Sequence, residues 1–85
     1  MNRSKLLERI THGHFRNVSF DDFVALVEGF GFRSARREGS QQAFVRPGVA
    51  EIVNLQPVLG EAKPYQIRQF LRLVEKSNLR LENRE

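Results

Sequence analysis

The sequence predicts an α+β fold with the element order α-β-β-β-α. Three consecutive strands form an antiparallel sheet, and one main helix precedes them in the chain while the other follows. Ser19 stands three residues before an acidic residue, a pattern typical of a helix start. Two turn signals, Gly39-Ser40 and Pro47-Gly48, separate three consecutive strand-like segments and favour an antiparallel meander. Pro64 then opens an amphipathic segment, as expected in the first turn of a helix. We expect both main helices on one face of the sheet.

A short extra helix is predicted at the N-terminus. Ser4 is placed to cap it, its apolar residues form one stripe, and Gly13 marks its end. This helix and the following loop, residues 1–17, should dock on a core formed by residues 18–80, with a tail over 81–85. The whole chain is therefore predicted to be one domain.

The first main helix is predicted over about residues 19–29, where apolar residues recur at helical spacing. Val18 precedes this segment and is placed to pack on Phe23 across the helix start. Gly29 or Gly31 can adopt the left-handed conformation that ends a helix.

The strands are predicted over residues 32–38, 41–46 and 49–55. The first segment is polar and basic, and the third is the most strand-like because it contains several aliphatic residues. The last helix begins at Pro64 and should stop near Asn78.

Composition narrows the classes of function. The 85 residues include 14 Lys and Arg against 10 Asp and Glu, a net charge of +4 that favours a polyanion or an acidic protein as partner. Cysteine is absent, which excludes disulfides and thiolate metal sites. No apolar run approaches the roughly 18 residues of a membrane span, and no signal-peptide core follows the first residues. We expect a cytoplasmic protein with no membrane partner, no metal and no cofactor.

Arginines concentrate around the predicted hairpin. Arg33, Arg36 and Arg37 belong to the first strand and Arg46 ends the second, so strand pairing gathers their charge. Regular alternation places Arg33 and Arg37 on one face and Arg36 on the other. These side chains form either an anion-binding surface or a solvated edge that opposes aggregation.

The last helix carries a second basic stripe. Arg68, Arg72 and Lys76 recur at four-residue spacing, where like charges repel by about a few tenths of a kcal/mol. An anionic ligand would offset this repulsion, and an ordinary solvated face is the alternative. Lys63 and the free amides that follow Pro64 add a small candidate anion site.

Aromatic and histidine residues leave alternatives open. Phe44 and Tyr65 are candidates for stacking on unpaired bases, although Phe44 fits better as a core residue facing the helices. His12 and His14 lie in the N-terminal loop, either as solvated residues or as a base that reaches the hairpin turn. A His-x-His pair without further ligands is a poor metal site.

Several short motifs occur in a recognisable order. Gly31-Phe32 leads into the basic strand, Phe44 precedes Pro47, and the longer motifs are Arg37-Glu38-Gly39-Ser40 and Ala62-Lys63-Pro64-Tyr65-Gln66. In order and spacing, roughly residues 18–80 resemble the HicA toxins of bacterial HicA-HicB toxin-antitoxin pairs. The resemblance implies a fold like the double-stranded-RNA-binding domain, metal-independent cleavage of mRNA, and neutralisation by a HicB-like antitoxin.

The chain departs from the HicA pattern at one position. The resemblance implies a catalytic histidine after the Gly-Ser of the first hairpin turn, and Gln41 stands there. An amide forms hydrogen bonds but does not titrate, so Gln41 cannot serve as a general base. Three alternatives follow: an mRNA endonuclease toxin, a catalytically inactive module that binds RNA or an antitoxin, or a general protein-interaction domain whose basic faces meet an acidic partner. The candidate RNA-binding residues are Arg33, Arg36, Arg37, Gly39, Ser40, Arg46, Lys63, Arg68, Arg72 and Lys76.

Overall fold

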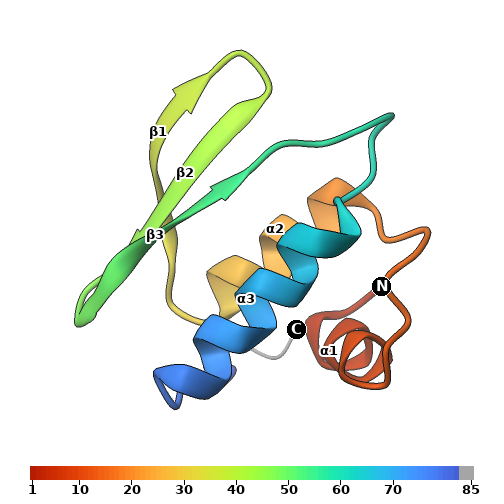
Figure 1. Cartoon of the computed structure of the whole chain (residues 1–85), viewed down its shortest axis with the longest axis horizontal. Coiled ribbons are helices and arrows are strands. Elements are labelled where there is room, and N and C mark those ends of the chain that lie inside the picture. The colour runs from red at the N-terminus through yellow and green to blue at the C-terminus, as the bar shows by residue number, and fades with distance from the viewer. Residues whose placement is uncertain (83–85) are drawn as a thin grey trace.

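The computed structural model describes residues 1–82, and residues 83–85 of the predicted tail lie outside the described part. The predicted α+β fold is confirmed, with an N-terminal helix before the α-β-β-β-α order (Figure 1). In chain order the elements are α1 (Arg3–Thr11), α2 (Phe20–Gly29), β1 (Arg33–Glu38), β2 (Gln41–Arg46), β3 (Val49–Leu55) and α3 (Pro64–Lys76).

The elements form three layers. The antiparallel sheet has the order β1-β2-β3, so β2 is its central strand. The helices α2 and α3 cover one face of the sheet, and α1 contacts α2 on the far side of this helical layer (Figure 1). Among the described elements, no helix covers the other face, which we call the outer sheet face.

The core lies between the sheet and the two main helices. Phe70 of α3 makes edge-to-face contacts with Phe23, Phe30 and Phe32, at ring-centroid distances of 5.7, 5.5 and 5.7 Å. Such pairs add about 0.5–1.5 kcal/mol each beyond the burial of their area. Phe44 of β2 is fully buried, so its predicted core position is confirmed.

The N-cap of α2 was predicted correctly, whereas the N-cap of α1 was not. Ser19 caps α2 as expected, because its hydroxyl oxygen accepts the backbone N–H of Asp22 at 3.3 Å. The predicted cap of α1 is wrong: Asn2 caps it by accepting the N–H of Lys5 at 2.8 Å, and Ser4 lies inside the helix. Asn and Ser are both good N-caps, so local sequence alone left the choice between neighbouring positions open.

The first strand contains a β-bulge. Ser34 pairs with Phe44, and the next paired residue, Arg36, lies opposite Ala43. Ala35 is therefore an extra residue in β1, which interrupts the regular alternation of side chains.

The bulge corrects the predicted distribution of the strand arginines. Directly opposed residues of an antiparallel pair share a face. Arg33 lies opposite Val45, so Arg33 and Arg36 both belong to the outer sheet face, whereas Arg37 lies opposite Gln42 on the other face. The prediction that Arg33 and Arg37 share a face is wrong, because it assumed an unbroken strand.

Candidate nucleic-acid interface

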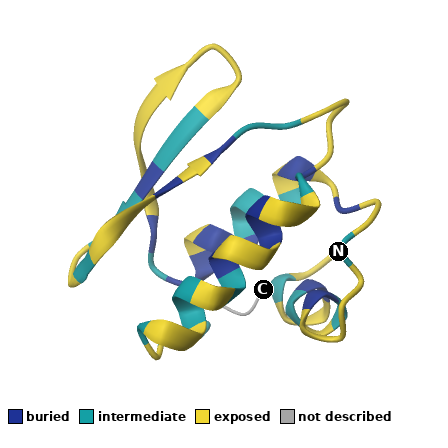
Figure 2. Cartoon of the chain, in the orientation of Figure 1, coloured by how far each residue is buried: buried dark blue, intermediate teal, exposed yellow. Residues whose placement is uncertain are grey.

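The outer sheet face presents a basic and polar surface to solvent. Every residue of β1 is exposed, and Figure 2 shows this strand exposed along its length. The cross-strand pairs place Glu38 opposite Gln41 and Ala43 opposite Asn54 on this face. The bulge adds Arg33 and Arg36 beside them, so the face combines positive charge with amide groups.

A shallow hollow of about 180 Å³ lies on this face around Gln41. Its other lining residues are Arg36, Glu38, Ala43 and Asn54. A guanidinium nitrogen of Arg36 lies 3.0 Å from a carboxylate oxygen of Glu38, and the two side chains are 76% and 68% exposed. Such exposed ion pairs contribute only about 0–1 kcal/mol, so a phosphate can replace Glu38 as the partner of Arg36.

The groups around Gln41 favour binding over proton transfer. The amides of Gln41 and Asn54 can donate to phosphate oxygens and can exchange hydrogen bonds with ribose hydroxyls. Of the residues that line the hollow, Glu38 carries the carboxylate, and carboxylate oxygens can accept the proton of a hydroxyl. The site can therefore hold a ribose-phosphate, and Glu38 is its candidate base.

Glu38 and Asn54 belong to this site, although neither was among the residues predicted from the sequence. Glu38 was predictable, because a two-residue hairpin turn places the residues on either side of it directly opposite each other. Asn54 was not, because the β2–β3 register shifts between Phe44 and Arg46 and carries no local signal.

The hairpin turn extends this surface. Gly39 and Ser40 are exposed, and Gly39 has a φ of 58°, which the turn requires and which favours glycine. Arg37 points to the other side of the hairpin and is also exposed. Figure 1 shows the turn projecting beyond the helical layer, so both sides of the hairpin tip are open to solvent.

Arg46 differs from the other hairpin arginines because its guanidinium contacts groups within the fold. Its Nε donates to the carbonyl of Phe30 at 2.8 Å, and its two terminal nitrogens lie 3.2 Å from the Pro47 carbonyl and 2.9 Å from a Glu82 carboxylate oxygen. Its side chain is only 23% exposed. A Cβ at Gly31 would lie 2.8 Å from the Arg46 Nε, so glycine makes room for this contact. Arg46 thus ties the end of α2 to the segment after α3.

The basic stripe of α3 is divided among three environments. The Lys76 ammonium lies 2.7 Å from a carboxylate oxygen of Glu51, and this hydrogen bond lowers the pKa of Glu51 and raises the pKa of Lys76. Arg68 lies over the ring of Phe15, with its central carbon 5.3 Å from the ring centroid. Arg72 stands between them, exposed on the helix. Their four-residue spacing therefore does not produce one continuous basic surface.

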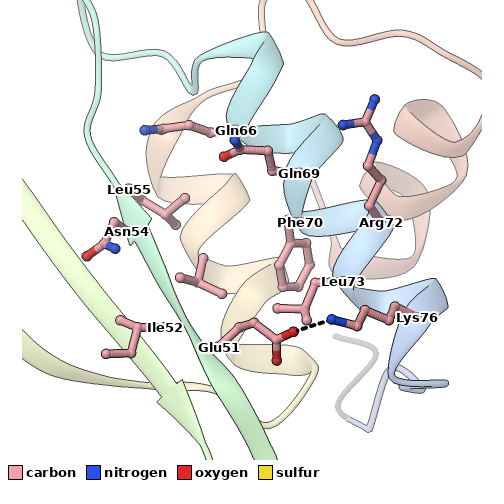
Figure 3. A pocket seen from close by; sticks show the side chains of 11 residues that line it. Glu51, Ile52, Asn54, Leu55, Gln66, Gln69, Phe70, Arg72, Leu73 and Lys76 are labelled. Atoms are coloured by element: carbon pink, nitrogen blue, oxygen red, sulfur yellow. Dashed lines mark hydrogen bonds and ion pairs between the residues drawn. The ribbon is translucent and has the colours of Figure 1, made fainter.

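Arg72 lines a groove of about 340 Å³ between the edge strand β3 and α3 (Figure 3). Leu55 and Phe70 contribute apolar walls, and the Glu51–Lys76 pair crosses the groove. Figure 3 shows the guanidinium of Arg72 directed away from β3. Apolar, amide and charged side chains line the groove together, and its Lys76 is paired with Glu51, so the groove does not extend the basic surface of the outer sheet face.

The remaining candidate residues lie away from the hairpin. Lys63 is the N-cap residue of α3 and makes no side-chain capping bond, and Tyr65, two residues further on, is 51% exposed. The ring Nδ1 of His12 lies 2.7 Å from the carbonyl of Glu8, at the end of α1. The loop with His12 and His14 lies across the helical layer from the sheet (Figure 1). Neither histidine is placed near Gln41.

The described residues were compared with the requirements of a metal site and of a membrane-spanning helix. Within residues 1–82, no group of three or more His, Cys, Asp or Glu side chains is arranged to hold a metal ion. None of the helices in that range is long and apolar enough to cross a membrane.

Comparisons with known proteins add no family assignment. No protein-family model matches the chain, and neither a curated protein nor a solved structure gives a significant match. The function is therefore inferred from the residues and their geometry.

Proposed function

We propose that this chain is a HicA-like RNA-binding component of a toxin-antitoxin pair and that its outer sheet face contacts RNA. One observation carries the proposal. The bulge at Ala35 places Arg33 and Arg36 on the same uncovered face as Gln41, the position at which the HicA pattern has its catalytic residue. Guanidinium groups bind phosphate through paired hydrogen bonds, so two of them on an open face suit an RNA backbone.

The proposed contacts divide by chemistry. Arg33 and Arg36 bind phosphates, and the amides of Gln41 and Asn54 bind ribose or base edges. Arg37, Gly39 and Ser40 extend the contact at the hairpin tip. Arg46 supports the fold instead, and the basic residues of α3 lie outside this surface.

Salt-dependent RNA binding tests this proposal. We expect the double variant R33Q/R36Q to bind single-stranded RNA at least tenfold more weakly at low salt, in fluorescence anisotropy titrations. Each lost phosphate contact should also reduce the slope of log K against log salt by about 0.7. The matched control K5Q/R80Q removes the same charge from exposed positions elsewhere. Equal losses of affinity and slope in both double variants would contradict a site on the outer sheet face.

A second candidate function is metal-independent RNA cleavage, and the position of Glu38 beside Gln41 favours it. In this reaction the Glu38 carboxylate accepts the proton of a ribose 2′-hydroxyl, and the oxygen attacks the adjacent phosphorus. The 5′-oxygen leaves with a proton from water, which produces a 2′,3′-cyclic phosphate. Gln41 and Arg36 hold the phosphate during the attack.

Cleavage of end-labelled RNA in the presence of a chelator separates the two candidates. If Glu38 is the base, E38Q should lose activity by about a hundredfold or more, while the control E51Q retains it. Q41H should raise the rate, because imidazole restores a titrating group. Cleavage by Q41H but not by the native chain would identify a binding module that lacks its catalyst.

The proposed protein partner is a HicB-like antitoxin that covers the outer sheet face. An adjacent open reading frame, co-expressed with the tagged chain, should give a complex that no longer binds RNA. R33Q/R36Q should weaken that complex more than K5Q/R80Q does. If the isolated chain binds no RNA and captures an acidic partner in a ribonuclease-insensitive way, it is a protein-interaction domain instead.

A further inference from the structure

A second basic surface lies away from the sheet, between the α1–α2 connection and the first turns of α3. It forms a hollow of about 530 Å³. Arg9 comes from α1, Arg16 from the connection and Arg68 from α3, so three guanidinium groups from separate segments line one hollow. His14, Phe15 and Pro64 contribute to its walls, and no carboxylate of residues 1–82 lines it.

Local contacts hold two of these arginines in place. Arg68 stacks over Phe15 at 5.3 Å, a distance typical of a cation–π contact, which fixes the guanidinium against the wall. A terminal nitrogen of Arg9 lies 3.4 Å from the backbone carbonyl of Arg16. These contacts limit the freedom of both side chains before any ligand binds, which reduces the entropy cost of binding.

The described residues that line the hollow include three arginines and no carboxylate. None of its three arginines forms an ion pair with a carboxylate within residues 1–82. Asp22, at the start of α2, instead lies 3.7 Å from the N-terminal amine of Met1. Three guanidinium groups without an acidic partner repel one another, and an anion placed among them would convert that repulsion into attraction.

We propose that this hollow binds the phosphate group of a nucleotide. Its volume falls within the range of about 300–1,000 Å³ that is usual for small-ligand sites. Guanidinium forks match phosphate geometry, and Phe15 and Pro64 provide an apolar wall for the attached base. The inference goes beyond the proposed function, because its residues lie on a different surface from Arg33, Arg36 and Gln41.

Binding is measured by titrating the isotope-labelled full chain with AMP and following its amide resonances by NMR. We expect shifts confined to residues 9–17 and 63–68, and clearly weaker binding of adenosine, which lacks the phosphate. Short RNAs with and without a 5′-phosphate identify the source of the phosphate. A preference for the phosphorylated RNA assigns the hollow to an RNA end, and equal binding of the two RNAs assigns it to free nucleotides.

Variants then test the residues. R16Q and R68Q should each weaken AMP binding about tenfold, while the control R80Q, at an exposed position outside the hollow, changes it less than about twofold. Arg16 is exposed and contacts Arg9 through its backbone, so R16Q leaves the fold intact even if R68Q loosens Phe15. R16K should give an intermediate loss, because lysine keeps the charge but not the fork. Equal binding of adenosine and AMP, or an equal loss in R80Q and R16Q, would overturn the proposal.

Discussion

The two faces of the sheet differ in the burial of their side chains, although the same strands form both. The inner face carries Phe44, Val53 and Leu55, which are buried against the helices, whereas the outer sheet face carries Arg33 and Arg36 in solvent. Alternate side chains of a strand point to opposite faces, so neighbouring positions can serve stability and binding separately. Substitutions on one face should therefore leave the property of the other unchanged.

Two arginines of the hairpin show the same difference between a side chain held within the fold and one exposed to solvent. The Arg46 side chain is 23% exposed and contacts two carbonyls and a carboxylate, while the Arg36 side chain is 76% exposed and contacts Glu38. Positive charge at a strand end is therefore not sufficient to identify an RNA contact. The number of internal acceptors that a guanidinium contacts distinguishes an arginine held within the fold from one that remains open to a ligand.

The largest effect should come from the inner face. F44A removes a fully buried aromatic ring and should lower the free energy of unfolding by about 3–5 kcal/mol. Because a small domain has only about 5–15 kcal/mol of stability, this variant should be partly unfolded in moderate urea. The measurement is urea unfolding followed by circular dichroism. On the outer sheet face, the control I52A should cost far less, since Ile52 is 58% exposed.

The next effect should come from G31A. Gly31 has a φ of 93°, where any residue with a Cβ is strained by about 1–3 kcal/mol, and the new methyl group would also meet the Arg46 side chain. Unfolding of G31A, R46A and the double variant gives a double-mutant cycle. We expect a strongly non-additive result, because both changes disrupt one contact. Additive losses would show that Gly31 and Arg46 act independently.

R46A alone should lower stability by about 1–3 kcal/mol, because it leaves the Phe30 carbonyl without its guanidinium donor. R36A should stay within about 0.5 kcal/mol of the native chain. RNA affinity should show the reverse order, with R36A the weaker binder. A stable R46A variant that loses RNA binding would transfer Arg46 to the binding surface and remove the contrast between the two arginines.

The parts of the fold that sequence could predict have local causes. Ser19 caps α2 and Pro64 opens α3, each through contacts within a single turn of helix. The bulge at Ala35 has no such cause, because no glycine or proline marks it and it exists only in the pairing of β1 with β2. A shift of one residue changes the face of every later side chain. The strand arginines were consequently assigned to the wrong faces.

The candidate sites were less predictable than the fold because they join distant segments. Arg46, which was predicted to contact RNA, instead pairs with Glu82, 36 positions later in the chain. The basic hollow combines Arg9, Arg16 and Arg68, which share no spacing that sequence patterns detect. Local pattern identifies charged residues, whereas tertiary packing decides which of them remain available to a ligand.

The smallest predicted effect concerns pH and the Glu51–Lys76 pair at the groove of Figure 3. The hydrogen bond from Lys76 holds the pKa of Glu51 below its ordinary value of 4.5, so its contribution to stability is present above that value and is lost as pH falls through the lowered pKa. For Lys76, whose pKa is raised above 10.5, the contribution is present below that value and is lost as pH rises through the raised pKa.

The melting temperature of E51Q should therefore depend less steeply on pH than that of the native chain, below about pH 4.5 and above about pH 10.5. The control E75Q, an exposed carboxylate of α3, should follow the native profile. Parallel profiles for E51Q and the native chain would show that solvent screens this exposed pair completely.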